Sequence, residues 1–209
     1  MTHSNPASAV FGTEPGVMGT GTNEPLDRAM DRYAEGDDRA FAELVRGLTP
    51  RLRAFLQRLA GSPDLADDLL QETFLRMHRA RGSFASGAAV VPWAYAIARN
   101  CFVSHTRAKK TRFSRNYVDL TEIDVAAGPD VNAEASACAA QSARVVEKTL
   151  AAMPVANREA FVLVRYEGLS VATAAELVGI SEGALKLRAF RAYEMLRAAL
   201  SENSAVERA

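Results

Sequence analysis

Asp68 and Glu72 are carboxylates four residues apart, a spacing that places both on the same face of a helix. Two neighbouring carboxylates can act as general acid and general base. No His, Ser or Cys accompanies this pair in a catalytic spacing, and the chain has no glycine-rich phosphate loop. The sequence therefore predicts a protein that is not an enzyme.

Cys101 and His105 are also four residues apart, which two ligands of one metal ion could use. No further Cys or His lies near them, so we expect a structural cysteine and an exposed histidine. We expect no metal site and no other cofactor.

Basic residues gather between positions 73 and 118, where there is no Asp or Glu, although the chain carries 25 acidic and 25 basic residues. A stretch of this kind predicts contact with nucleic acid. Trp93, Tyr95 and Phe102 lie among these cations, near Arg99 and Asn100, and aromatic rings beside cations can hold unstacked bases. The alternative for Trp93 is a place in the core.

The composition favours a soluble cytoplasmic protein. The chain has 209 residues, of which 48% are hydrophobic, enough for one medium core or two small ones. It contains no apolar run near the ~20 residues that cross a bilayer and no signal-peptide pattern, so we expect no membrane insertion. The chain has only two cysteines and no spacing typical of a disulfide framework, which fits a reducing compartment.

Hydrophobic periodicity predicts an all-α chain of two domains. The first is a helical bundle with a break or kink at Pro50, a turn at 61–64, and a loop of small residues at 82–92 before a helix from Trp93 to about Arg115. The expected divisions are a disordered tail (1–24), the bundle (25–116), a flexible linker (117–141), a second helical domain (142–201) and a tail (202–209).

The second domain carries the spacing of a helix-turn-helix. Ser170 can cap a short helix, Gly179 and Ile180 can form the turn, and Ser181 can cap a long last helix. One stripe of that helix is apolar, and the cations beside and opposite it are Lys186, Arg188 and Arg191. Leu187 and Phe190 face outward, either toward thymine methyl groups or toward a protein such as an inhibitor.

Four segments, 68–74, 93–100, 166–170 and 179–186, resemble the two conserved domains of extracytoplasmic-function (ECF) sigma factors of bacterial RNA polymerase. The resemblance covers roughly residues 26–200. It implies a sigma region 2-like bundle, a sigma region 4-like helix-turn-helix domain, and a function in promoter-specific transcription initiation. The implied partners are the polymerase core, promoter DNA and, as a further candidate, an anti-sigma factor.

The resemblance also implies three groups of site residues. The group expected to bind the clamp helices of the largest polymerase subunit is Asp68, Gln71, Glu72 and Leu75. The minus-ten group is Ser83, Phe84, Arg99, Asn100, Arg107, Lys109 and Lys110. The minus-thirty-five group is Ser181, Lys186, Leu187, Arg188 and Arg191. The chain departs from the usual family residues at Thr173, Ala174, Ala184, Leu185 and Leu187, and at Ser104, where the family usually has Asp.

A stand-alone helix-turn-helix regulator with an N-terminal dimerisation or sensing domain is the alternative. A simple repressor needs its cations mainly on the C-terminal motif. Here the densest cluster lies in the first domain, which favours the sigma factor.

Overall fold

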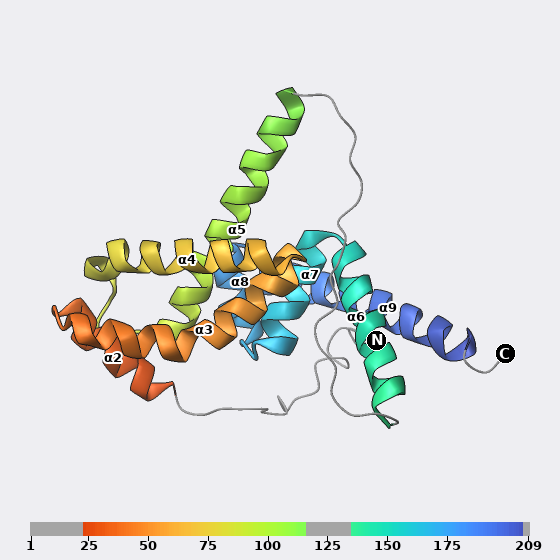
Figure 1. Ribbon diagram of the computed structural model, residues 1–209, viewed down its shortest axis with the longest axis horizontal. Helices are drawn as coiled ribbons and strands as arrows, with labels where there is room; N and C mark the ends of the chain where they lie inside the picture. The colour runs from red at the N-terminus through yellow and green to blue at the C-terminus, as the bar shows by residue number, and fades with distance from the viewer. Residues whose placement is uncertain (1–22, 116–134, 207–209) are drawn as a thin grey trace, which may run out of the picture. The chain divides into compact units, whose positions relative to one another are not determined.

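The computed structural model describes residues 23–115 and 135–206, which belong to two compact units (Figure 1). Both ranges are helical, with one 3-10 turn and one π turn and no strand. The prediction of an all-α chain is confirmed. Within the described residues, no helix is long and apolar enough to span a bilayer.

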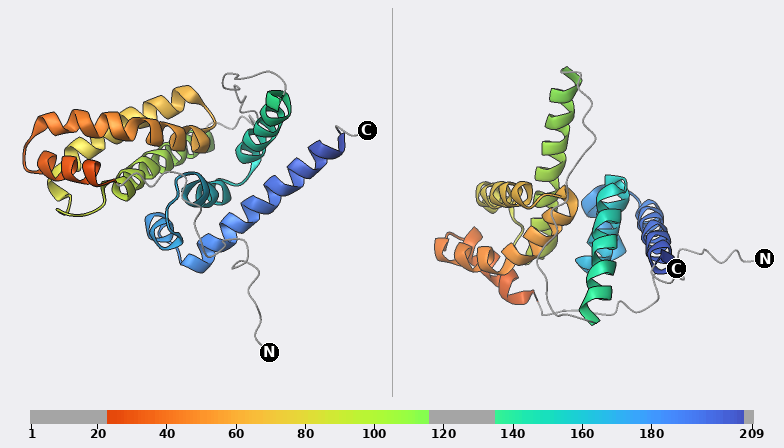
Figure 2. Two further views of the ribbon diagram at one scale, coloured as in Figure 1. Left: turned by 90° about the horizontal axis from the view of Figure 1, so that it is seen from below. Right: turned by 45° about the vertical axis from the view of Figure 1, so that its right-hand side comes forward.

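Four helices form the first unit: α2 (Glu24–Ala34), α3 (Asp38–Ala60), α4 (Pro63–Ala80) and α5 (Val90–Arg115). The 3-10 turn η1 (Arg81–Ser83) follows α4. Helix α3 packs against the other three helices, and α5 also contacts α2 and α4 (Figures 1 and 2). The loop 84–89 therefore links two helices that are both packed into the bundle.

Local signals set the ends of these helices. The Asp37 carboxylate accepts a hydrogen bond from the Arg39 N–H at 3.1 Å and caps α3. Ser62 caps α4, and the αL conformation of Gly61 (φ 70°) ends α3. Of the break or kink expected at Pro50, the break is wrong: α3 continues through this residue, because its buried face runs from Leu44 to Leu59.

The core of the first unit is built from the inner faces of all four helices. Met30, Leu44, Leu52, Phe55 and Tyr95 are each no more than 1% exposed. The Phe55 and Tyr95 rings meet edge to face with their centroids 5.1 Å apart.

The second unit contains α6 (Ala135–Ala152), α7 (Val155–Phe161), a π turn η2 (Val162–Tyr166), α8 (Val171–Val178) and α9 (Glu182–Val206). Helix α9 packs against α6, α7 and α8. Helix α6 begins inside the segment expected to be linker, because its first turns are rich in Ala, the strongest helix former. Most of the predicted tail 1–24 and of the predicted linker 117–141 lies outside the described residues, and so do residues 207–209 of the predicted tail 202–209. Helix α9 extends to Val206, into that last predicted tail.

Candidate polymerase and nucleic-acid interfaces

One face of α4 presents the predicted polymerase-binding group. Asp68 and Gln71 are exposed, Leu75 is 46% exposed, and Glu72 is half-buried. Glu72 accepts a hydrogen bond from the Arg76 Nε at 2.7 Å, one turn further along the helix. The structure therefore brings the four residues together, with Asp68 facing solvent and Glu72 paired.

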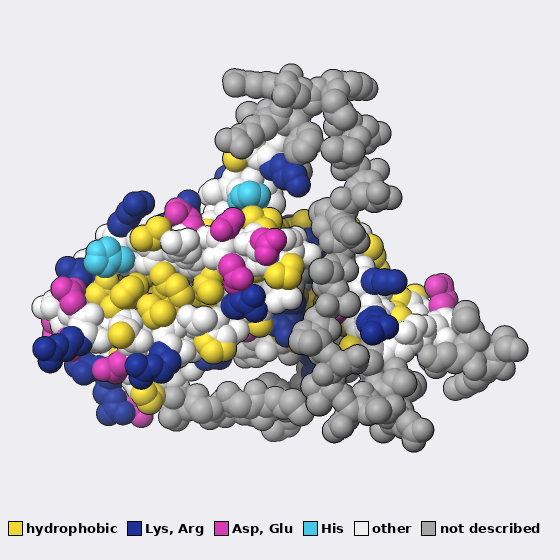
Figure 3. Space-filling view, in the orientation of Figure 1, with side chains coloured by type: hydrophobic (Ala, Val, Ile, Leu, Met, Phe, Trp, Pro, Cys, Tyr) yellow, Lys and Arg dark blue, Asp and Glu magenta, His cyan; other side chains and the backbone are white. Residues whose placement is uncertain are grey.

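An apolar surface adjoins this face, between α3 and α4 (Figure 3). The half-buried rings of Phe41 and Phe74 meet there edge to face at 6.2 Å, and Tyr33 stacks on Phe41 at 4.9 Å. Apolar side chains bordered by charges are typical of protein interaction surfaces.

The inner face of α4 packs on α5. Thr73 is fully buried, and its hydroxyl donates to the Leu69 carbonyl at 2.7 Å.

Cys101 on α5 is 2% exposed, and burial raises the pKa of its thiol. His105 is exposed, so the expectation of a structural cysteine and an exposed histidine is confirmed. The described residues hold no cluster of three or more potential metal ligands.

The loop between η1 and α5 has a defined backbone. The Ser83 hydroxyl donates to the Ala80 carbonyl at 2.8 Å, and the Ala88 N–H donates to the Ala85 carbonyl at 3.0 Å. Gly87 has a φ of 77°, which disfavours any residue with a Cβ. Between Phe84 and Val90 the side chains are small, so the loop presents mainly backbone atoms and the Ser86 hydroxyl.

Three of the aromatic rings expected beside bases are buried. Tyr95 and Phe102 are 1% and 3% exposed, so the expectation that they hold bases is wrong: both face the core of the bundle. Phe84 is 9% exposed and packs edge to face on Trp93 at 5.1 Å. Trp93 is half-buried, and this contact makes it a support for the loop.

The polar members of the minus-ten group follow α5 along its outer side. Asn100, Arg107 and Lys109 are exposed and Arg99 is half-buried. The Lys110 side chain lies outside the described residues. Helix α5 begins at Val90 rather than Trp93, since Pro92 is tolerated in a first turn.

Sequence reasoning missed the groups that hold this loop. The Val90 N–H donates to Asp27 at 2.8 Å and the Gly87 N–H donates to Asp31 at 3.1 Å, both acceptors being on α2. Arg81 donates to Asp38 at 2.6 Å and lies over the Tyr33 ring, whose hydroxyl forms a hydrogen bond with His78. These pairs are distant in sequence, and no local pattern indicates them.

The helix-turn-helix is formed as the spacing predicts. Ser170 accepts from the Thr173 N–H at 3.0 Å and Ser181 accepts from the Ala184 N–H at 3.2 Å. Gly179 ends α8 in the αL conformation, with φ 75°. The prediction of two capped helices with a glycine turn is confirmed.

Helix α9 separates a buried stripe from an outer face. Leu185, Ala189 and Ala192 are at most 2% exposed, as expected for the core stripe. On the outer face, Leu187 is 48% exposed, Arg191 is exposed, and Lys186, Arg188 and Phe190 are half-buried. Lys186 lies 3.7 Å from Glu182, so one of the three cations has an acidic neighbour on its own helix.

The buried Arg158 side chain links α7 to the C-terminal end of α6 in the second unit. Sequence reasoning also missed this residue. It is 7% exposed and donates to the carbonyls of Leu150 and Ala151, which satisfies the C-terminal end of α6. Burial lowers the pKa of its guanidinium. Its position in α7 gives no sign of this function, because an arginine at a helix start usually faces solvent.

Comparison with known proteins agrees with this geometry. Sigma-70 region 2 matches residues 44–112, and Sigma-70 region 4 matches residues 143–196. The chain is 36% identical over 177 residues to RNA polymerase sigma factor CarQ of Myxococcus xanthus, covering 83% of this chain and 96% of that protein. It is 35% identical over 181 residues to ECF RNA polymerase sigma factor SigF of Caulobacter vibrioides, covering 85% and 94%.

Two solved structures have a similar fold over most of the chain. The sigma factor RpoE, solved with the anti-sigma factor NepR from Bartonella quintana, has a TM-score of 0.65 and 26% identity over 77% of this chain and 96% of that one. CnrH, solved with the cytosolic domain of CnrY, has a TM-score of 0.62 and 23% identity over 85% and 98%, a likeness of fold.

A helical region 2 unit and a region 4 helix-turn-helix define a sigma-70-type initiation factor. The chain belongs to the ECF RNA polymerase sigma factors. It is thus a non-enzymatic subunit that directs transcription initiation, and the alternative of a stand-alone regulator is set aside.

Proposed function

We propose that this sigma factor works in the cytoplasm through three surfaces: the α4 face binds the clamp helices of the polymerase, loop 83–90 and outer α5 capture the minus-ten strand, and α9 reads the minus-thirty-five duplex. The observation that carries this proposal is the exposure of these surfaces on packed helices. Asp68, Asn100 and Arg191 are all exposed.

The α4 surface combines charge with apolar area. Along α4, exposed Gln71 lies one turn and exposed Asp68 two turns before Leu75. The apolar surface with the Phe41 and Phe74 rings adjoins this face. Apolar contact supplies affinity in such an interface, while the carboxylates give register and favour a basic partner surface.

The minus-ten surface suits a separated DNA strand. Asn100, Arg107 and Lys109 offer polar and cationic groups along α5, and the loop offers backbone atoms of small residues. Cations track phosphates, and a loop without bulky side chains leaves room for an extruded base. Phe84 and Trp93 act here by supporting the loop, since their rings pack on each other.

The minus-thirty-five surface is the outer face of α9. Ser181 and Lys186 lie near its N-terminus, where backbone N–H groups favour phosphate. Arg188 and Arg191 are one turn apart and suit phosphates or guanine edges. The 48% exposure of Leu187 supports a contact with a thymine methyl group.

An anti-sigma factor is the third partner that we propose. The similar sigma factor RpoE was solved with the anti-sigma factor NepR. On this chain, Leu75 and Leu187 are apolar and exposed, and an inhibitor that covers either would block polymerase or promoter binding. DNA contact and inhibitor contact at Leu187 are compatible, because the two partners would bind in turn.

Charge reversal on α4 tests the polymerase interface. Asp68→Lys should abolish co-purification with core polymerase and run-off transcription from a genomic promoter library, with unchanged helical content by circular dichroism. Asp68 is cleaner than Glu72, whose reversal also breaks the pair with Arg76. The control is Glu35→Lys, an equal charge change at the exposed C-cap residue that follows α2. Wild-type binding by Asp68→Lys, or its unfolding, would refute the assignment.

The free chain should bind promoter duplex poorly at ~150 mM salt and bind it well with core polymerase. Its net charge is zero and the basic stretch is flanked by acids, so long-range attraction is cancelled. A gel shift with and without core polymerase measures this. Tight specific binding by the free chain would contradict the proposal.

A further inference from the structure

Two carboxylates on α2 accept hydrogen bonds from the backbone of the loop that precedes α5. Asp27 accepts the Val90 N–H at 2.8 Å, and Asp31 accepts the Gly87 N–H at 3.1 Å. The two acceptors are four residues apart and therefore lie on one face of the helix. Their donors lie at the apex of the loop and at its junction with α5.

Each of these hydrogen bonds restrains a different feature. Val90 is the first residue of α5, so Asp27 satisfies one of the N–H groups that a helix leaves open and places a negative charge at its positive end. Gly87 has a φ of 77°, and Asp31 fixes the direction of its N–H at the point where the chain reverses. Hydrogen bonds to a charged acceptor are roughly twice as strong as neutral ones.

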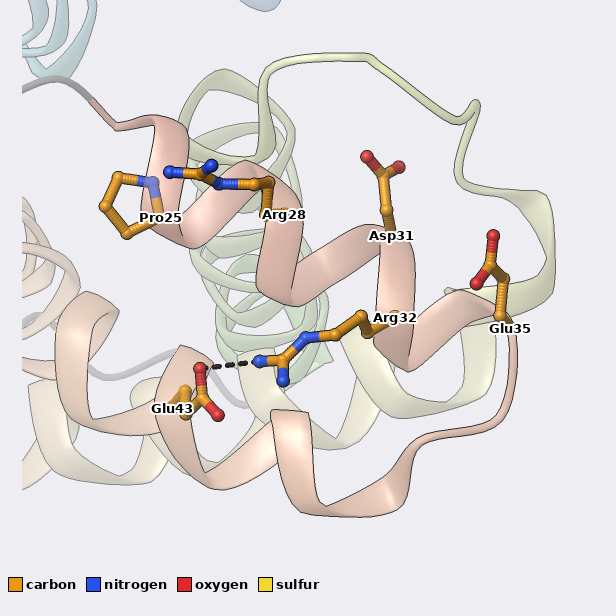
Figure 4. Close-up of a pocket in the computed structure, with 6 residues that line it drawn as sticks. All are labelled: Pro25, Arg28, Asp31, Arg32, Glu35 and Glu43. Carbon is orange, nitrogen blue, oxygen red and sulfur yellow. Dashed lines mark hydrogen bonds and ion pairs between the residues drawn. The ribbon is translucent and has the colours of Figure 1, made fainter.

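Helix α2, which carries these carboxylates, is fixed in the bundle by buried side chains and by a hydrogen bond to α3. Met30 and Tyr33 are at most 1% exposed, and Arg32 donates to Glu43 on α3 at 2.7 Å. Figure 4 shows Arg32 pointing toward α3 and Asp31 pointing away from it, on the side opposite Glu43. At Gly47 of α3 the helices approach so closely that a Cβ there would lie 2.5 Å from a Leu26 methyl carbon.

From these contacts we infer that Asp27 and Asp31 are positioning residues for promoter opening: they hold loop 83–90 in the shape that receives the melted strand. The inference rests on the proposed function of that loop. Helix α2 precedes the region 2 match, which begins at residue 44, and neither carboxylate belongs to the predicted site. A helix that needs no contact with DNA thus governs how well the protein captures an open strand.

The test uses the full-length protein, alone and with core polymerase. Hydrogen exchange of the peptide spanning 83–91 measures whether the loop is held. The DNA probe is a fork junction, single-stranded in the minus-ten element, built on a promoter recovered from the run-off experiment. A fully duplex version of the same DNA and the affinity for core polymerase are the reference measurements.

Asp31→Ala should speed exchange in the loop and weaken fork-junction binding about tenfold, the lower end for losing a hydrogen bond to a charged group. Duplex binding and affinity for the polymerase should stay unchanged. Asp31→Asn should restore most of the binding, because the amide oxygen can accept the same hydrogen bond. Glu35→Ala is the matched control, an exposed acid at the C-cap of the same helix that should behave as wild type.

Three results would overturn the inference, each at a different step. Unchanged exchange in both Asp31→Ala and Asp27→Ala would mean that the carboxylates do not hold the loop. Equal losses in Asp31→Ala and Glu35→Ala would make the effect one of overall charge. Faster exchange with unchanged fork-junction binding would show that the loop does not capture the strand, and the failure would then lie in the proposed function of the loop.

Discussion

The helix-turn-helix and loop 83–90 are both short segments fixed by hydrogen bonds. The two differ in how far apart in sequence the donors and acceptors of these hydrogen bonds lie. In the former, the cap at Ser170 joins residues three apart, and so does the cap at Ser181. In the latter, Gly87 and Val90 bond to partners 56 and 63 residues away.

This difference determines which part of the structure a substitution affects. A change in a helix-turn-helix cap acts on one helix end. A change on α2 reaches the loop without altering any residue of the loop. Substitutions at Leu185, Arg191, Ser170 and Cys101, each with its comparison and taken from the largest expected effect to the smallest, can break or sharpen this contrast.

Leu185→Ala should have the largest effect. Leu185 is fully buried where α9 packs in the second unit, and truncating a buried leucine costs about 2 to 5 kcal/mol of unfolding free energy. Chemical denaturation followed by hydrogen exchange should locate the loss in residues 155–200, with loop 83–90 unchanged. Faster exchange in the loop as well would break the contrast.

The control two residues away is Leu187→Ser, at a position that is 48% exposed. It should leave thermal stability unchanged and relax preference at one base pair of the minus-thirty-five element. Lost stability with unchanged preference would refute the outward placement of this side chain.

Arg191→Ala should weaken promoter binding by roughly 1 to 3 kcal/mol if the guanidinium reads a base. A matrix of promoter mutants separates the two kinds of contact, since a phosphate contact loses affinity about equally on all sequences. Arg188→Ala, one turn earlier and half-buried, is the comparison. Normal promoter binding by both variants would contradict the proposed surface on α9.

Ser170→Ala should cost about 1 kcal/mol, the usual effect of losing a helix N-cap. Ser170→Asp should retain most of the stability, because a carboxylate caps equally well. The loss should appear in melting of the second unit, with no change in exchange of loop 83–90. A neutral Ser170→Ala would mean that tertiary packing alone holds α8.

The smallest effect is a pH dependence at Cys101. Burial raises the pKa of this thiol in the folded state, so its contribution to stability is present below the unfolded pKa, roughly 8.5, and is lost as pH rises further. Cys101→Ala should flatten this decline at pH values above the unfolded pKa. Parallel slopes of melting temperature against pH in both proteins would show that the thiol does not contribute.

The same contrast explains what the sequence could predict. Ser170, Gly179 and Ser181 act on neighbours within four residues, so their spacing alone predicted the motif. The exposed α4 face followed from helical periodicity. Asp27 and Asp31 have donors more than fifty residues away, which no local pattern can reveal.

Two errors have physical reasons of the same kind. Pro50 favours a helix break locally, but the buried face of α3 on both sides of it outweighs that preference. The rings of Tyr95 and Phe102 lie among cations in sequence, yet both point into the bundle, where apolar burial decides their direction.

The 63-residue separation between Asp27 and Val90 also determines how long after Asp27 its hydrogen-bond donor is synthesised. At about 5 to 20 residues per second, the ribosome needs roughly 3 to 13 seconds to add the segment between them. Helix α2 therefore leaves the ribosome well before the loop to which it is hydrogen-bonded, and a nascent chain cannot form the proposed minus-ten surface until α5 has begun to emerge.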